Sequence, residues 1–218
     1  MKIIDNYADL PVGKYLDILA ANEGDADDLD KQVATIAILC DVTEADILNL
    51  PLPDYTALAR AADFLHHEDK GDHRLAKRYT LGGLALVPCT DSRKMTTAQY
   101  IDFQTMTRDG DYDRHLPEIL SCFLVPEGHT YGDGYDFADV QDAIRRHLSV
   151  TDALSLLAFF FVSLRKLTDA SLTLSERATH LVKDKTMRRA MRQKIRETRK
   201  AMKEGATPST PAGAGSQP

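Results

Sequence analysis

The chain has 218 residues, which is enough for one hydrophobic core or for one core with an appended segment. Hydrophobic residues make up 43% of the chain and charged residues 28%, as in an ordinary soluble globular protein. The first residues lead directly into polar sequence and a proline without an apolar core, so we expect no secretory signal peptide.

The charge is unevenly distributed along the chain. Between Leu164 and Glu204 there are 13 Lys/Arg and 5 Asp/Glu residues, a balance of +8. The other residues include 14 basic and 28 acidic side chains, a balance of −14. This division predicts a basic segment that either packs on the chain's own acidic body or binds an acidic partner.

Four short amphipathic helices are expected in the first 65 residues. In the second of them, Leu29, Val33 and Ile36 fall on one stripe, which predicts a side that faces the core. Short loops separate the four segments, as they do between packed antiparallel helices. The expected helices cover residues 11–22, 27–39, 43–50 and 53–65.

A β-hairpin is predicted at residues 78–88, where two short strand-like runs flank Gly82 and Gly83. An isolated hairpin is only marginally stable in water, so this one must pack on the helices or pair with another strand. The glycine pair does not indicate a phosphate-binding loop, because neither a Lys-Ser/Thr sequence nor a helix follows it.

The second half of the domain is also expected to be helical. One helix is expected to begin at residue 95. Three others are expected to cover residues 115–125, 137–148 and 149–167. The last is the most apolar, but its apolar core, residues 154–164, is shorter than the roughly 20 residues of a membrane span. We interpret it as the central buried helix of a soluble domain, capped by Ser149 and packed against residues 116–124.

The predicted fold class is therefore mainly α. A compact multi-helix domain with one small β-hairpin covers residues 1–170, a long basic helical arm covers 171–204, and a disordered tail covers 205–218. Apolar residues are too sparse in the arm for burial alone to hold it. Its most basic part, residues 183–200, could also contact nucleic acid phosphates, without sequence specificity.

No catalytic motif is found, and we expect a protein that is not an enzyme. There is no Gly-x-Ser-x-Gly sequence, and Cys122 lies in an apolar segment where a thiolate is disfavoured. The three widely spaced cysteines, Cys40, Cys89 and Cys122, are expected to be buried reduced thiols, which fits the cytoplasm.

Two groups of His and Asp residues are candidate metal sites, but we predict no metal and no cofactor at either. One is interpreted as a turn and a helix cap, because its spacing is not that of a calcium loop. It comprises His129, Asp133, Asp136 and Asp139. The other is interpreted as a polar loop without the ligand spacing of a zinc site. It comprises His66, His67, Asp69, Asp72 and His73.

Four stretches of the chain carry a resemblance to a known family. They are AQYIDFQ (98–104), ILSCFLVPEG (119–128), YGDGYD (131–136) and SVTDALSLLAF (149–159). Over about residues 5–170 this pattern resembles small proteins encoded in the tail-gene clusters of phages and prophages of Bacteroides-type bacteria, often regarded as tail assembly chaperones.

The resemblance implies a helical, non-enzymatic protein that works in the cytoplasm of the host cell. Tail assembly chaperones bind the long tape measure protein and keep its apolar helices from aggregating until the tail tube forms. The family has no fixed motif of binding residues, so the resemblance transfers none to this chain.

The candidate partner-binding residues are instead expected at exposed or hinge positions. They are Phe159, Phe160, Phe161, Arg188, Arg189, Arg192 and Arg196. The expected partner is a tape-measure-like or other tail protein, and an acidic body with a basic arm could also join copies of the chain into a homo-oligomer. Two other interpretations stay open: a structural virion component such as a head–tail connector or tail subunit, and a nucleic-acid-binding accessory protein that acts through residues 183–200.

Overall fold

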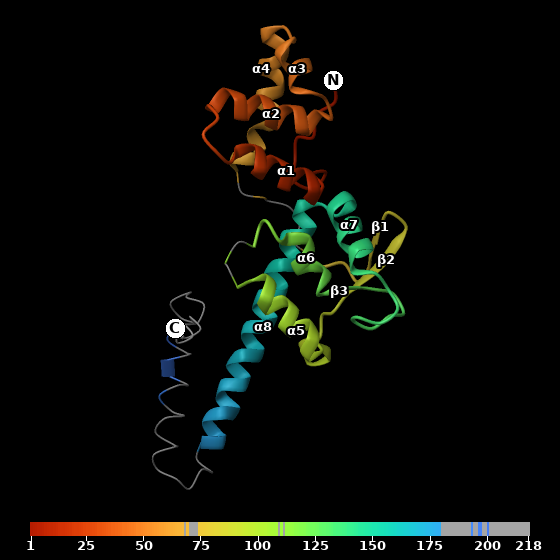
Figure 1. Ribbon diagram of the computed structural model, residues 1–218, viewed down its shortest axis with the longest axis vertical. Helices are drawn as coiled ribbons and strands as arrows, with labels where there is room; N and C mark the ends of the chain where they lie inside the picture. The colour runs from red at the N-terminus through yellow and green to blue at the C-terminus, as the bar shows by residue number, and fades with distance from the viewer. Residues whose placement is uncertain are drawn as a thin grey trace, which may run out of the picture. The chain divides into compact units, whose positions relative to one another are not determined.

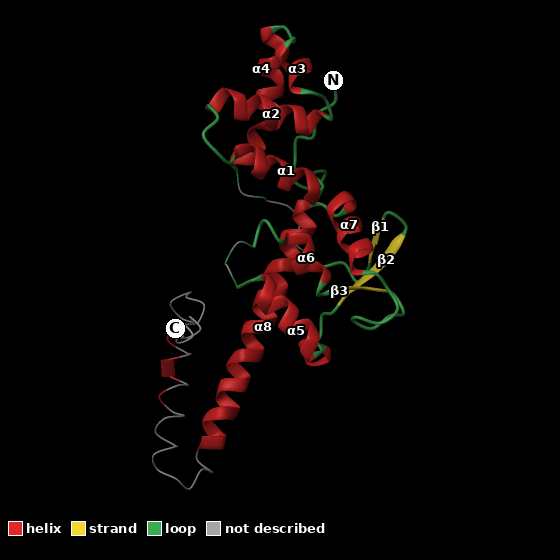
Figure 2. Ribbon diagram, in the orientation of Figure 1, coloured by secondary structure: helices red, strands yellow, loops and turns green. Residues whose placement is uncertain are grey.

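The structure is a computed structural model. It describes residues 1–67, 69, 74–108, 110, 112–179, 193, 196, 197 and 200, with the backbone alone for residues 92 and 166–179. The chain divides into two compact units, Met1–Phe161 and Val162–Pro218. The first unit is mainly helical and has one small antiparallel sheet, as Figure 1 and Figure 2 show.

The first 66 residues form the predicted group of short helices. The first three have a clear reason to start where they do: Pro11 precedes the first, and the Asp27 carboxylate accepts a hydrogen bond from the Asp30 backbone N–H at the start of the second. Thr43 and Asp46 form a capping box on the third. The helices are α1 (Val12–Asn22), α2 (Asp28–Cys40), α3 (Glu44–Leu48), α4 (Leu52–Ala61) and the 3₁₀ helix η1 (Ala62–His66).

A short backbone bridge joins the start of α1 to the start of α8 (Val150–Thr179). The Val12 N–H donates to the Leu148 carbonyl and the Val150 N–H donates to the Leu10 carbonyl, both at 2.9 Å. All four of these side chains have at most 1% of their surface exposed. The bridge therefore places two segments that are far apart in the sequence inside one core.

The predicted hairpin is present and is part of a larger sheet. Strands β1 (Tyr79–Leu81) and β2 (Leu84–Pro88) are antiparallel, and the two glycines between them have positive φ angles of 56° and 90°. Two consecutive positive φ values are what a tight primed turn requires. A third strand, β3 (Leu124–Pro126), pairs antiparallel with β2 and supplies the additional pairing that an isolated hairpin lacks.

The prediction of a continuous helix over residues 115–125 was wrong. Helix α6 covers only Leu116–Ser121, and the chain then turns into β3. A short apolar run does not by its periodicity distinguish a buried helix from a buried strand. The open edge of β2 decides the outcome, since the Leu86–Pro126 and Pro88–Leu124 pairs place this run in the sheet.

The core of the second half contains a group of aromatic rings. Phe123 and Phe160 stack with ring centroids 4.0 Å apart and planes 12° apart, and each is almost completely buried. This contact confirms that the Phe-rich helix packs against residues 116–124. Phe103 meets the Phe123 ring edge-on at 5.3 Å. It comes from α5 (Thr97–Met106), whose predicted capping box of Thr96 and Gln99 is present.

Helix α8 is longer than predicted. It starts as expected, with the Ser149 hydroxyl accepting a hydrogen bond from the Asp152 N–H, but it continues past Leu167 to Thr179 without a break. It thus runs through the predicted boundary between residues 170 and 171. Apart from residues 193, 196, 197 and 200, the rest of the basic arm and the tail over 205–218 lie outside the described residues.

The crossing of α1 over α7 (Phe137–His147) depends on a glycine. A Cβ atom at Gly13 would lie 2.8 Å from the Arg145 carbonyl oxygen and 2.9 Å from its Cγ. The carbonyl belongs to a helix backbone and has little freedom to move away. No larger residue fits at this position without separating the two helices.

We therefore expect Gly13→Ala to destabilise the protein by roughly 1–3 kcal/mol, the usual cost of overpacking a core. The direction of this change in stability is informative, because Gly→Ala inside a helix otherwise stabilises a protein by up to about 1 kcal/mol. Urea unfolding of the variant measures the change. The control is Ala20→Gly on the exposed side of α1, which should lose about 1 kcal/mol from helix propensity alone. A Gly13→Ala variant more stable than the wild type would contradict the close crossing.

Candidate functional site

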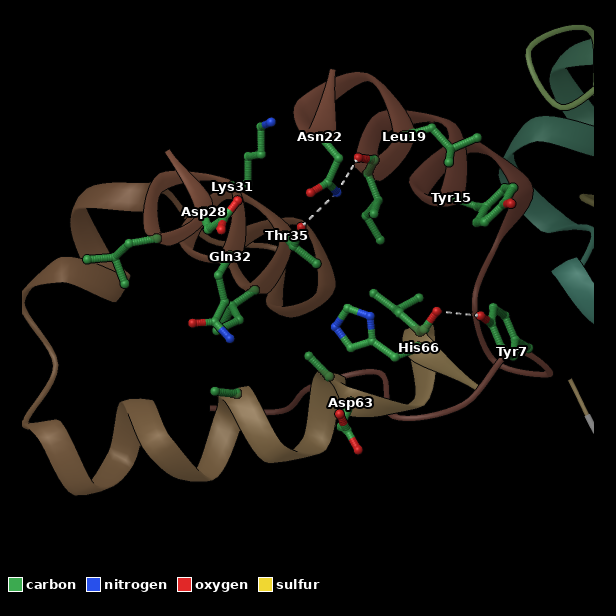
Figure 3. Close-up of a pocket in the computed structure, with 16 residues that line it drawn as sticks. Tyr7, Tyr15, Leu19, Asn22, Asp28, Lys31, Gln32, Thr35, Asp63 and His66 are labelled. Carbon is green, nitrogen blue, oxygen red and sulfur yellow. Dashed lines mark hydrogen bonds between the residues drawn. The ribbon is translucent and has the colours of Figure 1, made fainter. Parts of the chain in front are cut away.

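A cavity of about 740 Å³ lies between α1, α2 and the α4–η1 segment, and we call it the N-terminal groove. Figure 3 shows it with α1 and α2 along one side and α4 and η1 along the other. It is lined by Tyr7, Tyr15, Ile18, Leu19, Asn22, Asp28, Leu29, Lys31, Gln32, Thr35, Ile36, Ala59, Ala62, Asp63, Leu65 and His66.

The floor of the groove is aliphatic and its walls are half-buried. Ile18, Ile36 and Ala62 have 5%, 0% and 9% of their surface exposed. The apolar stripes of the helices therefore do converge as predicted, but their outer members are not fully covered. Leu29 was expected to face the core, and that was wrong: it is 58% exposed at the first turn of α2, next to the groove.

Hydrogen bonds hold the walls in place. The Asn22 amide donates to the Ile18 carbonyl at 2.8 Å and to the Thr35 hydroxyl at 3.2 Å, which ties α1 to α2. On the other side the Tyr7 hydroxyl donates to the Leu65 carbonyl at 3.1 Å (Figure 3). These bonds satisfy polar groups that would otherwise be costly to bury beside an apolar floor.

The two tyrosines of the groove stay neutral. Burial raises the pKa of Tyr7, and the charge of Asp69 raises it further. Burial also raises the pKa of Tyr15, with a smaller contribution from Asp113. Both rings therefore present uncharged, amphipathic surfaces, with hydroxyl groups that donate hydrogen bonds and aromatic faces suited to apolar contacts.

The predicted phenylalanine site is divided between the core and the surface. Phe160 has 1% of its surface exposed and lies in the core against Phe123, so its ring is not at the surface of the structure. Phe159 and Phe161 are half-buried. Phe161 makes edge-on contacts with Phe103 at 5.8 Å and with Tyr112 at 5.1 Å, which leaves little of the ring for a partner.

The predicted arginine site lies mostly beyond what the structure describes. Arg188, Arg189 and Arg192 fall outside the described residues, and Arg196 is exposed. Of the predicted partner-binding residues, the structure therefore describes Phe159, Phe160, Phe161 and Arg196.

The Asp-rich loop is a turn and a helix cap. The Asp136 carboxylate accepts a hydrogen bond from the Ala138 N–H at the start of α7, and Asp139 lies in the first turn of that helix. The ring of His129 contacts the Asp133 carbonyl instead of a carboxylate. Across the described residues, no three His, Cys, Asp or Glu side chains come close enough to hold a metal ion. Asp72 and His73 of the other group lie outside the described residues.

Cys122 is protected from ionisation by its surroundings. Burial raises the pKa of its thiol to about 12, and the Tyr131 hydroxyl, which binds the Asp102 carboxylate at 2.7 Å, lies 4.0 Å from the sulfur. Burial and the hydrogen bond to Asp102 also raise the pKa of Tyr131. A thiol in this setting is a poor nucleophile, so the cluster is a packed polar contact between α5, α6 and the loop after β3.

Among the described residues, no helix combines the length and the apolarity that crossing a bilayer requires.

Comparison with protein-family models, with curated proteins and with solved structures found no match for this chain. Sequence reasoning did not find the N-terminal groove, because it expected the stripes of α1, α2 and α4 to cover one another. No single motif marks the groove in the sequence, because its lining residues come from segments spread over residues 7–66.

The buried thiol gives a prediction for alkaline pH. Between pH 9 and pH 12 the unfolded thiol loses its proton and the folded one keeps it, so ionisation favours the unfolded state and stability falls. Between pH 8 and pH 10 this term should amount to about 1 kcal/mol. We expect the wild type to lose about 1 kcal/mol more stability between pH 8 and pH 10 than the Cys122→Ala variant, as measured by urea unfolding at both pH values. Equal losses would show that the thiol ionises normally in the folded protein.

Proposed function

We propose that this chain is a non-enzymatic assembly chaperone or adaptor of phage tail morphogenesis, which binds a helical client such as a tape measure protein. The observation that supports a binding role most directly is the N-terminal groove, with its aliphatic floor and tyrosine walls. The tail-assembly context rests on the sequence resemblance alone, and on that basis the protein acts in the cytoplasm of the host cell.

The groove suits a helix of the client. Amphipathic helices bind in grooves between helices through apolar anchors spaced at i, i+3, i+4 and i+7. A volume of about 740 Å³ takes several such anchors, and the half-buried Leu19 and Leu65 offer apolar surface on opposite walls. Because these walls are only partly covered, a client that fills the groove buries additional apolar area and can still be released.

Copies of the chaperone would lie side by side on a long client. An acidic body and a basic C-terminal arm provide complementary surfaces for such a homo-oligomer. Nucleic acid is a less favoured partner of the arm, and we expect no membrane partner.

Filling the groove should abolish client binding. We expect Ala59→Phe, which places a ring on the half-buried wall of α4, to reduce capture of the co-expressed tape-measure-like protein at least tenfold in a pull-down. The matched control is Ala57→Phe, on the exposed side of the same helix and outside the groove. Circular dichroism and thermal unfolding of both variants confirm that the fold is retained.

Other results would favour other functions. Failure of the wild-type chain to capture or solubilise any tail protein of its own gene cluster would overturn the proposal. Detection of the chain in purified virions would identify a structural component, because a chaperone leaves the finished particle. Micromolar binding to DNA that falls linearly on a plot of log affinity against log salt concentration would identify a nucleic-acid-binding protein.

A further inference from the structure

The N-terminal groove lies in the most acidic part of the chain. Residues 1–67 contain 13 Asp/Glu and only 4 Lys/Arg, a balance of −9. Four of these acids, Asp25, Asp27, Asp28 and Asp30, are exposed at the start of α2. Such a field attracts cationic ligands and repels anionic ones.

The lining residues of the groove include two aspartates and one lysine, a balance of −1 from Asp and Lys. Asp28 lines the groove, and no described residue neutralises its carboxylate. Lys31 is the one Lys or Arg among the lining residues, and its ammonium group already donates to the Gly24 carbonyl at 2.9 Å. Asp63 lies on the opposite wall, where its carboxylate points away from the cavity (Figure 3). This carboxylate lies 3.2 Å from a ring nitrogen of His67. The ring of His66 points into the cavity of the groove (Figure 3).

Apolar and acidic surfaces are therefore adjacent at one place. Leu29, which is 58% exposed, follows Asp28 directly in the first turn of α2. The aliphatic floor of Ile18 and Ile36 lies below them. A ligand that contacts both surfaces needs apolar anchors on one side and positive charges on their flank, which is the pattern of a basic amphipathic helix.

We propose that the N-terminal groove selects a cationic amphipathic helix of a partner protein, with Leu, Ile or Met anchors on the groove floor and Lys or Arg residues opposite the start of α2. This inference rests on the proposed function, because it specifies the chemistry of the client at the same groove. Electrostatic complementarity contributes more to selection and association rate than to total affinity.

Two model peptides test the charge preference. Both are fluorescein-labelled 18-residue helices with leucine at i, i+3, i+4 and i+7 spacing, and the remaining positions are lysine in one and glutamate in the other. With the full-length chain we expect at least tenfold tighter binding of the lysine peptide by fluorescence anisotropy at low salt. The difference should decrease at 0.5 M salt, where exposed charges are screened.

Substitutions locate the effect. Asp28→Lys should weaken lysine-peptide binding severalfold, and Glu44→Lys, which reverses an exposed first-turn acid of α3 outside the groove, should change it less than twofold. Ala59→Phe should remove binding of the lysine peptide.

The inference is overturned if neither peptide binds, if both bind equally, or if lysine-peptide binding survives Ala59→Phe. Its failure is distinguishable from failure of the proposed function. Capture of the tail client without a charge preference would leave the chaperone role in place and remove the inference. A groove-dependent preference for the lysine peptide without capture of any tail protein would remove the chaperone role and leave the inference in place.

Discussion

The fold depends on the bridge between residues 10–12 and 148–150. Its two hydrogen bonds lie between four completely buried side chains, and burial of each such side chain contributes roughly 1.5–3 kcal/mol. The bridge lies at the starts of α1 and α8, so it connects the N-terminal helices to the core around Phe123. Gly13 follows immediately and allows α1 to cross α7 at backbone contact distance.

The N-terminal groove is a consequence of this arrangement. The bridge fixes one end of α1, and α2 packs along it, while η1 closes the other side through the edge-on contact of Tyr7 with Phe64 at 5.1 Å. Short helices held in this way cannot bring all of their apolar stripes together. The uncovered remainder is concentrated between them, and an apolar surface of this kind is what a helical client requires.

Local interactions made much of the fold predictable. Each capping residue bonds to a neighbour two or three positions away, as Thr43, Thr96 and Ser149 do, so it is visible in the sequence before any tertiary contact is known. The hairpin turn is also a local feature, because the adjacent residues Gly82 and Gly83 form it by themselves. The β3 strand was not predictable, because only the free edge of β2, almost 40 residues earlier, turns that apolar run into a strand.

The sequence by itself determined the helical class, the caps, the hairpin, the buried Phe-rich helix and the separation of acidic and basic segments, because periodicity, turn geometry and charge are local properties. Only the tertiary structure decided which apolar residues are covered. It buried Phe160, which had been a candidate for partner contact, exposed Leu29, which had been assigned to the core, and left the N-terminal groove open. Burial depends on the partner surface that the fold brings to each side chain, and no stretch of sequence contains that information alone.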